Sequence, residues 1–177
     1  MTAADLFSAV SFDDNAQTPM LIRAFQQGDA RALWEVFYSA IHVTASADYS
    51  PEQVEAWAPH EVDIAKWTSR MQVIAPFVVE DLDNKIIGYA DVQQTGYIDH
   101  FFVSPEVSRQ GVGTLLMRKI HETATRRAIA SLFSDVSITA KPFFERWGFN
   151  VESPQTVVIR GVKLGNFKMR KTLLTES

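Results

Sequence analysis

The stretch from Tyr97 to Ile120 constrains the fold of this 177-residue chain more than any other part of it. Its first part, Tyr97 to Val103, is aromatic and β-branched and lies between a glycine and a Ser-Pro pair, which is typical of a strand. From Val112 onward, apolar residues recur at the spacing of one helical face. The sequence therefore predicts a strand, a loop with two glycines and a helix, in that order.

The loop between the strand and the helix contains Gly111 and Gly113. Residues without a Cβ let the backbone turn tightly and let a ligand approach its amides. A helix that begins here leaves its first N–H groups unpaired and directs the positive end of its dipole at the turn. The loop alone is compatible with an ordinary turn that binds nothing, or with an anion site, most naturally for a pyrophosphate.

Three phosphate-binding motifs can be compared with this loop. A dinucleotide fingerprint needs a third glycine where Leu116 stands, and no Gly-Lys-Ser/Thr is present for a P-loop. The loop resembles the acyl-coenzyme A motif of the GNAT N-acetyltransferases, V-x-P-x-x-[Q/R]-x-x-G-x-G/A. The matching residues are Val103, Pro105, Gly111 and Gly113.

The loop departs from this motif at two positions. Ser108 stands where the family usually has Gln or Arg, and Arg109 stands where a further glycine is common. We therefore expect the backbone cradle of the motif to be kept, whereas its side-chain contact at Ser108 departs from the family pattern.

Two further segments strengthen the resemblance. Residues 137–149, SITAKPFFERWGF, are similar to the family's N-x-x-A-x-x-[FL]-Y-x-x-x-G-F, and residues 49–59, YSPEQVEAWAP, resemble the YafP-like bacterial branch. Between Met20 and Leu173 the predicted order is strand, helices, three strands, helix, strand, helix and two strands. That order is similar to the GNAT arrangement.

The resemblance implies an α/β fold of the α+β kind, the GNAT acyl-CoA N-acyltransferase fold. We expect a mixed, mostly antiparallel sheet with splayed central strands, flanked by helices. Strands at 73–80 and 85–94 are joined by a four-residue turn, so they should be antiparallel, unlike strands of a doubly wound fold. Residues 1–18 are predicted to be an N-terminal extension, and residues 19–177 a single domain.

Composition excludes several classes of function. A net charge of −4 argues against nucleic acid as the main partner. The absence of cysteine excludes disulfides and thiolate chemistry. The first residues do not resemble a signal peptide, and no stretch is long and apolar enough to span a membrane, so we expect a cytoplasmic protein.

The resemblance implies that acetyl-coenzyme A is the co-substrate. It should lie between the strands at 97–103 and 131–139, with its pantetheine arm on strand backbone, its pyrophosphate on the amides from Arg109 to Thr114, and its thioester end beside two phenylalanines. The expected contacts are Phe102, Val103, Ser108, Arg109, Gln110, Gly111, Val112, Gly113, Thr114, Ser137, Phe143 and Phe144.

The resemblance also places the catalytic residues on the strand at 97–103. Strand alternation predicts that Tyr97, Asp99 and Phe101 share one face, opposite Ile98, His100 and Phe102. We expect Asp99 to be the general base and Tyr97 a positioning group or alternative acid. A charged residue at a strand edge is the alternative for Asp99, and a core position is the expectation for His100.

The family often uses a tyrosine as the acid where this chain has Phe144, and an asparagine where it has Ser137. A thiol has an ordinary pKa of about 8.5, so its thiolate leaves without strong help and the reaction does not require that tyrosine.

The acceptor site in this family is built from the first helices and the last hairpin. The candidates are His42, Tyr49, Trp57, Asn166 and Phe167. Acidic residues nearby favour an amine of a small molecule. No metal ion is expected, and a homodimer is one alternative for the assembly.

The sequence thus predicts an N-acetyltransferase that moves an acetyl group to a primary amine by direct attack in a ternary complex. The alternatives are a non-catalytic acyl-coenzyme A binding or sensing domain and, less favoured by the acidic charge balance, an acylase of charged tRNA.

Overall fold

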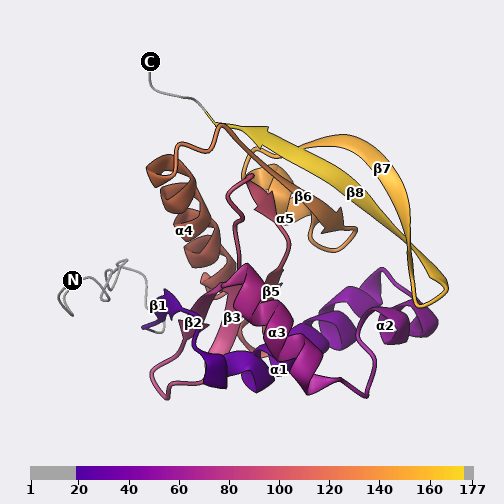
Figure 1. The fold of residues 1–177 in the computed structure, drawn as a ribbon. Helices are drawn as coiled ribbons and strands as arrows, with labels where there is room; N and C mark the ends of the chain where they lie inside the picture. Colours follow the sequence, from indigo (N-terminus) through magenta and orange to yellow (C-terminus); the bar gives the residue numbers. More distant parts are fainter. Residues whose placement is uncertain (1–18, 174–177) are drawn as a thin grey trace.

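The computed structural model describes residues 19–173, which form two sheets with helices packed around them (Figure 1). The predicted extension at 1–18 and residues 174–177 lie outside the described part. The strands are β1 (Leu21–Ala24), β2 (Phe77–Glu80), β3 (Ile86–Ala90), β4 (Tyr97–Ile98), β5 (Phe101–Val103), β6 (Ser131–Ser137), β7 (Asn150–Ile159) and β8 (Val162–Thr172). The α-helices are α1 (Ala30–Ser39), α2 (Pro51–Trp57), α3 (Ile64–Ile74), α4 (Val112–Arg126) and α5 (Lys141–Arg146). Short helical turns are η2 (Gln27–Asp29), η3 (Ala40–Thr44, a π-helix), η4 (Ala45–Ala47) and η5 (Pro105–Val107).

The first sheet has the strand order β1-β2-β3-β5 and the second has the order β4-β6-β8-β7. All pairs are antiparallel except β4 and β6, which are parallel. The mixed, mostly antiparallel pairing is confirmed, and the predicted element order is confirmed except at one strand.

The predicted strand from Tyr97 to Val103 is wrong in one respect, because it is two strands. It breaks at Asp99 and His100, so that β4 joins the second sheet and β5 the first. The predicted alternation of faces fails with it: Ile98 packs in one core cluster with Phe101, three residues later. Phe102 instead packs against the other cluster.

The helices cover the two faces of the first sheet. One core cluster joins α4 to β2 and β3, and the other joins α1 and α3 to the opposite face (Figure 1). The α4 helix lies close to the sheet at Gly88, where a Cβ would come within 2.6 Å of Val112 Cγ1. Trp67 Nε1 donates to Ala30 O at 2.7 Å and ties α3 to α1.

Two element boundaries differ from or refine the prediction. The predicted strand start at Val73 is wrong, because α3 continues to Ile74, whose side chain is buried at helical spacing from Met71. The final hairpin is confirmed, with Arg160 and Gly161 both at positive φ in its two-residue turn. Within residues 19–173, none of the helices has the length and apolar character needed to cross a membrane.

Candidate active site

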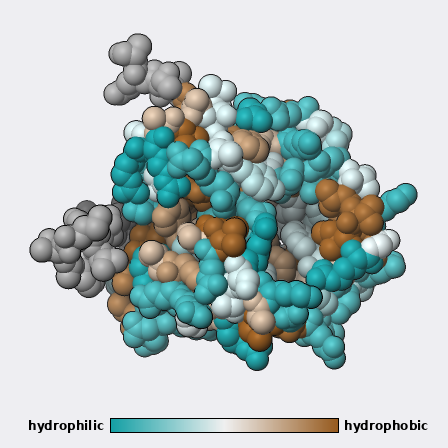
Figure 2. Space-filling view, in the orientation of Figure 1, coloured by the Kyte–Doolittle hydropathy of each residue, from teal (hydrophilic) through white to brown (hydrophobic). Residues whose placement is uncertain are grey.

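A cleft of about 390 Å³ opens between the helices and the final hairpin. Figure 2 shows the surface hollowed where, in Figure 1, β7 and β8 stand away from α1 and α3. Aromatic rings from the helices and from β5 form one wall, namely Trp34, Phe37, Trp57, Trp67 and Phe102. The polar groups that line the cleft include two carboxylates, Asp99 and Asp135.

The strand break at the back of the cleft is held by Asp91. Its Oδ1 accepts hydrogen bonds from the backbone N–H of Asp99 at 3.0 Å and of His100 at 2.6 Å. The N–H of Asp91 donates in turn to His100 O at 3.1 Å. One buried side chain thus replaces the strand partner that these two amides have lost.

Burial raises the pKa of Asp91 to about 6, although the two backbone bonds and the Gln93 amide oppose the shift. The residue is fully buried. Burying an ionised carboxyl at neutral pH costs free energy. We therefore assign Asp91 a structural role at the strand break.

The break leaves an open backbone edge on β5. His100 O accepts from Asp91, and Ser104 N–H donates to Ile87 O at 2.9 Å. Because antiparallel pairing alternates, the backbone groups of Phe101 and Val103 point away from β3. β4 pairs only with Phe133 and Ser134, so the last residues of β6 face this gap.

The glycine turn lies beside β5. Gly111 caps α4 at φ 92°, and Arg109 has a φ of 62° at the position where the motif often has glycine. Gly113 lies against Phe143, since a Cβ would be 3.2 Å from its ring. The first turn of α4 thus packs closely on Phe143, and its first backbone amides lack partners within the helix.

Asp99 is held at the cleft wall by an ion pair with Arg70 of α3. The carboxylate side chain is 17% exposed and the guanidinium 54%. His100 Nε2 is 4.0 Å from Asp99 Oδ2, and His100 Nδ1 lies 3.0 Å from the Tyr89 hydroxyl. Burial lowers the pKa of His100 to about 4, so its ring is neutral at neutral pH. His100 is thus largely enclosed, with 13% of its side chain exposed, and it also lines the cleft, which the expected core position did not include.

Tyr97 donates a hydrogen bond to Asp135 at 3.2 Å, and Gln155 donates to the other carboxylate oxygen at 2.7 Å. Burial and the neighbouring Asp135 charge raise the pKa of Tyr97. Its hydroxyl therefore remains a hydrogen-bond donor at neutral pH.

The structure brings seven of the predicted site residues to one cleft: Tyr49, Trp57, Tyr97, Asp99, Phe102, Ser137 and Asn166. Phe144 is buried among Phe101, Phe143 and Phe149 and does not line the cleft. Phe167 packs against the same core cluster and also lies outside.

His42 lies outside this cleft as well, and its Nε2 donates to Ala58 O at 2.7 Å.

Tyr49 connects the helices to the second sheet. Its hydroxyl donates to Gly165 O at 2.7 Å and accepts from the Ile138 N–H at 3.0 Å. Burial raises its pKa. Asn166 differs, because its buried Oδ1 has no hydrogen-bond partner among the described residues. An acceptor in that state is suited to a ligand N–H.

Sequence reasoning missed Asp91, Arg70 and Asp135. Asp91 accepts hydrogen bonds from the amides of residues eight and nine positions later. Arg70 belongs to α3, and the sequence alone does not predict where that helix packs. Asp135 carried a signal, since it is a charged residue in a strand opposite the splay.

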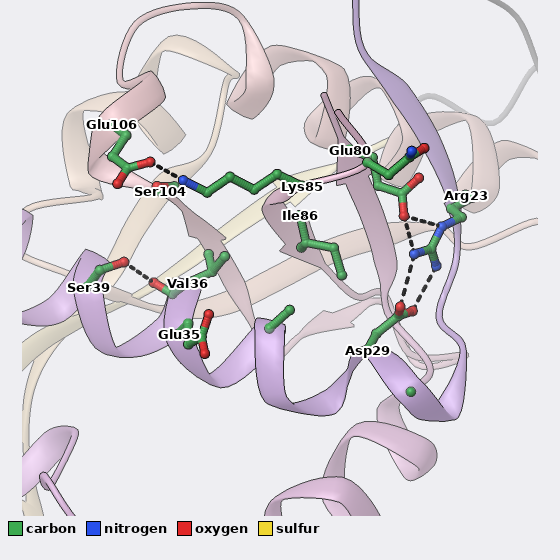
Figure 3. A pocket seen from close by; sticks show the side chains of 13 residues that line it. Arg23, Asp29, Glu35, Val36, Ser39, Glu80, Lys85, Ile86, Ser104 and Glu106 are labelled. Atoms are coloured by element: carbon green, nitrogen blue, oxygen red, sulfur yellow. Dashed lines mark hydrogen bonds and ion pairs between the residues drawn. The ribbon is translucent and has the colours of Figure 1, made fainter. Parts of the chain in front are cut away.

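A second cavity, of about 410 Å³, lies on the other side of α1 (Figure 3). Most of its charged groups pair with one another: Arg23 bonds Asp29 and Glu80, and Lys85 bonds Glu106. The Arg23 pairs join β1, η2 and β2, and the Lys85 pair joins the turn before β3 to η5, so we assign the cavity a structural role.

Known proteins resemble this chain over most of its length. The family model for the acetyltransferase (GNAT) domain matches residues 45–173. The uncharacterized N-acetyltransferase YafP of Escherichia coli K12 is 36% identical over 149 residues, which is 84% of this chain and 93% of that protein.

Solved structures agree. A GCN5-related N-acetyltransferase from Rhodopseudomonas palustris has a TM-score of 0.84 at 29% identity, covering 91% of this chain and all of that one. YncA of Salmonella typhimurium, a structure with acetyl-CoA, has a TM-score of 0.64 at 19% identity, covering 89% and 96%. The latter shows a shared fold.

Proposed function

This chain belongs to the GNAT acetyltransferases, and we propose that it transfers the acetyl group of acetyl-coenzyme A to the primary amine of a small molecule. Both substrates bind together, and the amine attacks the thioester directly. The observation that carries the proposal is the open edge of β5, which lies between the aromatic cleft and the glycine turn of α4.

The donor half of the site consists of backbone groups. Acetyl-coenzyme A supplies an activated thioester, and its extended arm suits the open edge of β5 as an added strand. The amides from Gly111 to Thr114 are suited to the pyrophosphate. Arg109 is exposed beside them and adds a charge-assisted contact.

The acceptor half is the aromatic cleft. A protonated amine is attracted both to aromatic faces and to carboxylates, and the cleft offers both kinds of group. Asn166 Oδ1 supplies an acceptor for the amine's N–H. The cleft volume of about 390 Å³ matches a small molecule.

Asp99 is the proposed general base. An alkyl ammonium has an ordinary pKa of about 10, so a group in the cleft must take its proton before attack. Asp99 takes it directly or through water, and its pairing with Arg70 fixes the carboxylate at the cleft wall. The amide of Val103 stabilises the oxyanion, and Tyr97 positions the amine. The thiolate leaves without a dedicated acid.

A second function, acyl-coenzyme A binding without turnover, is favoured by one observation. Phe144 occupies the position of the family's acid and is buried in the core, so no phenol stands there.

Mixing the protein and acetyl-coenzyme A with a panel of small primary amines, and measuring free thiol, separates the two functions. We expect amine-dependent thiol release for a small cationic amine. Tight binding of acetyl-coenzyme A with no thiol release across the panel contradicts the transferase and supports the binding domain. Peptide amines serve as the comparison, because a cleft of this volume should disfavour them.

A further inference from the structure

Three side chains of the kinds that bind metal ions meet near α2, outside the cleft. His42 comes from η3, Glu55 from α2 and His60 from the loop that follows α2. One ligand atom from each lies within 4.8 Å of the others. None of the three lines the cleft.

The hydrogen bonds around His42 leave one ring nitrogen able to bind an ion. Its Nε2 lies 2.7 Å from Ala58 O, and because a carbonyl only accepts, Nε2 carries the hydrogen. The lone pair is then on Nδ1. Stacking on the Tyr38 ring, with centroids 3.9 Å apart, fixes the plane of the imidazole. An outer-shell carbonyl that orients a histidine is a regular feature of metal sites.

His60 is oriented in a similar way. Its Nδ1 contacts the Tyr38 hydroxyl, which can accept the ring N–H and leave the lone pair on Nε2. That Nε2 lies 3.6 Å from Glu55 Oε2, too far for a hydrogen bond. Two ligands of one tetrahedral zinc ion are about 3.3 Å apart, given bond lengths of about 2.0–2.2 Å. The separation therefore fits a shared ion better than a direct bond.

We propose that His42, Glu55 and His60 bind a divalent transition-metal ion, with zinc as the type case and solvent completing the coordination. Two imidazoles and one carboxylate suit zinc, nickel or copper, whereas calcium and magnesium prefer oxygen ligands throughout. The side chains of His60 and Glu55 are 72% and 47% exposed, so an ion can enter from solvent. The π-helix η3, a conformation frequent at functional sites, places His42 beside them.

The ion has a structural task outside the acetyl transfer. Glu55 and His60 flank Trp57, which lines the acceptor cleft. α2 has only seven residues, and an ion shared with η3 fixes both its end and the following loop. The bound ion therefore holds one wall of the cleft in place.

The test uses the full chain, free of any affinity tag and stripped with a chelator. Binding of zinc chloride is measured by titration calorimetry, and binding of cobalt(II) is measured by visible absorption. We expect one ion per chain and a cobalt spectrum that added zinc abolishes. Absence of saturable binding overturns the proposal.

Variants assign the site. His60→Ala should abolish zinc binding, and the variant should fold because this side chain is exposed. His42→Ala should also abolish zinc binding. Tyr38→Phe should weaken affinity roughly 10–100-fold by releasing the His60 ring. Glu52→Gln, on the same helix but outside the cluster, should bind as the parent does. Binding that survives in both histidine variants overturns the proposal.

Discussion

The carboxylate of Asp91 accepts a hydrogen bond from the backbone N–H of His100 at 2.6 Å, although both residues lie in the segments that join strands. A second bond, to the N–H of Asp99, is 3.0 Å long. Together they stabilise the point at which one extended segment leaves one sheet and enters the other. A side chain from outside β5 thus helps to hold the strand break beside which the open edge of β5 lies.

Asp91→Asn should make the stability of the protein less sensitive to pH. Burial raises the pKa of Asp91 from 3.8 to about 6, so the folded state prefers the protonated form. The parent is therefore stabilised at low pH and loses that stability as the pH rises through about 6. We expect the free energy of unfolding of the parent, relative to that of the variant, to fall by about 2–3 kcal/mol between pH 4 and pH 7. Urea unfolding at each pH measures it.

The difference between parent and variant is the informative quantity, because His100 acts in the opposite direction. Its pKa is lowered to about 4, so its contribution grows as the pH rises through the same range. Asp83→Asn, in an exposed turn, is the control and should show no such trend. A difference that is independent of pH would mean that Asp91 has the same pKa in the folded and unfolded states.

Asp99→Asn should separate turnover from binding. We expect the affinity for acetyl-coenzyme A to stay within a few-fold of the parent, since the donor half is backbone. Turnover should fall on the order of 10²–10⁴, the range for losing a general base. Higher pH should restore part of it, because more of the amine is then neutral.

Arg70→Gln is the matched variant for this experiment, because it breaks the same ion pair and keeps the carboxylate. It should reduce turnover much less than Asp99→Asn. Equal losses of turnover in the two variants would show that the reaction depends on the ion pair and that Asp99 does not act as the base.

Gly113→Val should abolish binding of acetyl-coenzyme A. A Cβ at this position is already 3.2 Å from the Phe143 ring, so the branched side chain must displace that ring or fill the approach to the amides. Calorimetry measures the effect. Gly28→Val is the control, since nothing lies within 4 Å of a Cβ there. Near-normal affinity in Gly113→Val would leave the turn a purely structural element.

Tyr49→Phe should destabilise the fold by about 1–3 kcal/mol, the cost of leaving buried polar groups unpaired. The change removes one bond to Gly165 O and one from the Ile138 N–H. Urea unfolding measures it, in the presence of a chelator. The Tyr38 hydroxyl contacts an exposed histidine, so Tyr38→Phe should change the free energy of unfolding by less than about 0.5 kcal/mol. Equal losses of stability in Tyr49→Phe and Tyr38→Phe would show that the hydrogen bonds of Tyr49 do not stabilise the contact between the helices and the second sheet.

Local patterns carried most of the sequence prediction. Gly111 and Arg109 lie at positive φ within a turn whose spacing is visible in the sequence, and the family resemblance drawn from it is confirmed by the matches to known proteins. The final hairpin was equally local, because its turn joins adjacent segments.

The features that were missed depend on contacts between distant segments. Five of the seven residues from Tyr97 to Val103 are aromatic or β-branched, so the prediction continued the strand through Asp99 and His100. The break at these two residues accompanies the pairing of β5 with β3 and of β4 with β6. Arg70 reaches Asp99 only after α3 has docked on the sheet. Likewise, His42, Glu55 and His60 follow no ligand motif and meet only through the folding of η3 against α2.

The division of residues 97–103 between two sheets also sets an order for folding during synthesis. All four strands of the first sheet are contained in residues 21–103, whereas β4 has no partner until β6 has been made, about 30 residues later. As the chain leaves the ribosome, β5 can dock on β3 while β6 is still absent. The gap between β5 and β6 therefore lies between strands that are synthesised at different times, because all strands of the first sheet precede β6, β7 and β8.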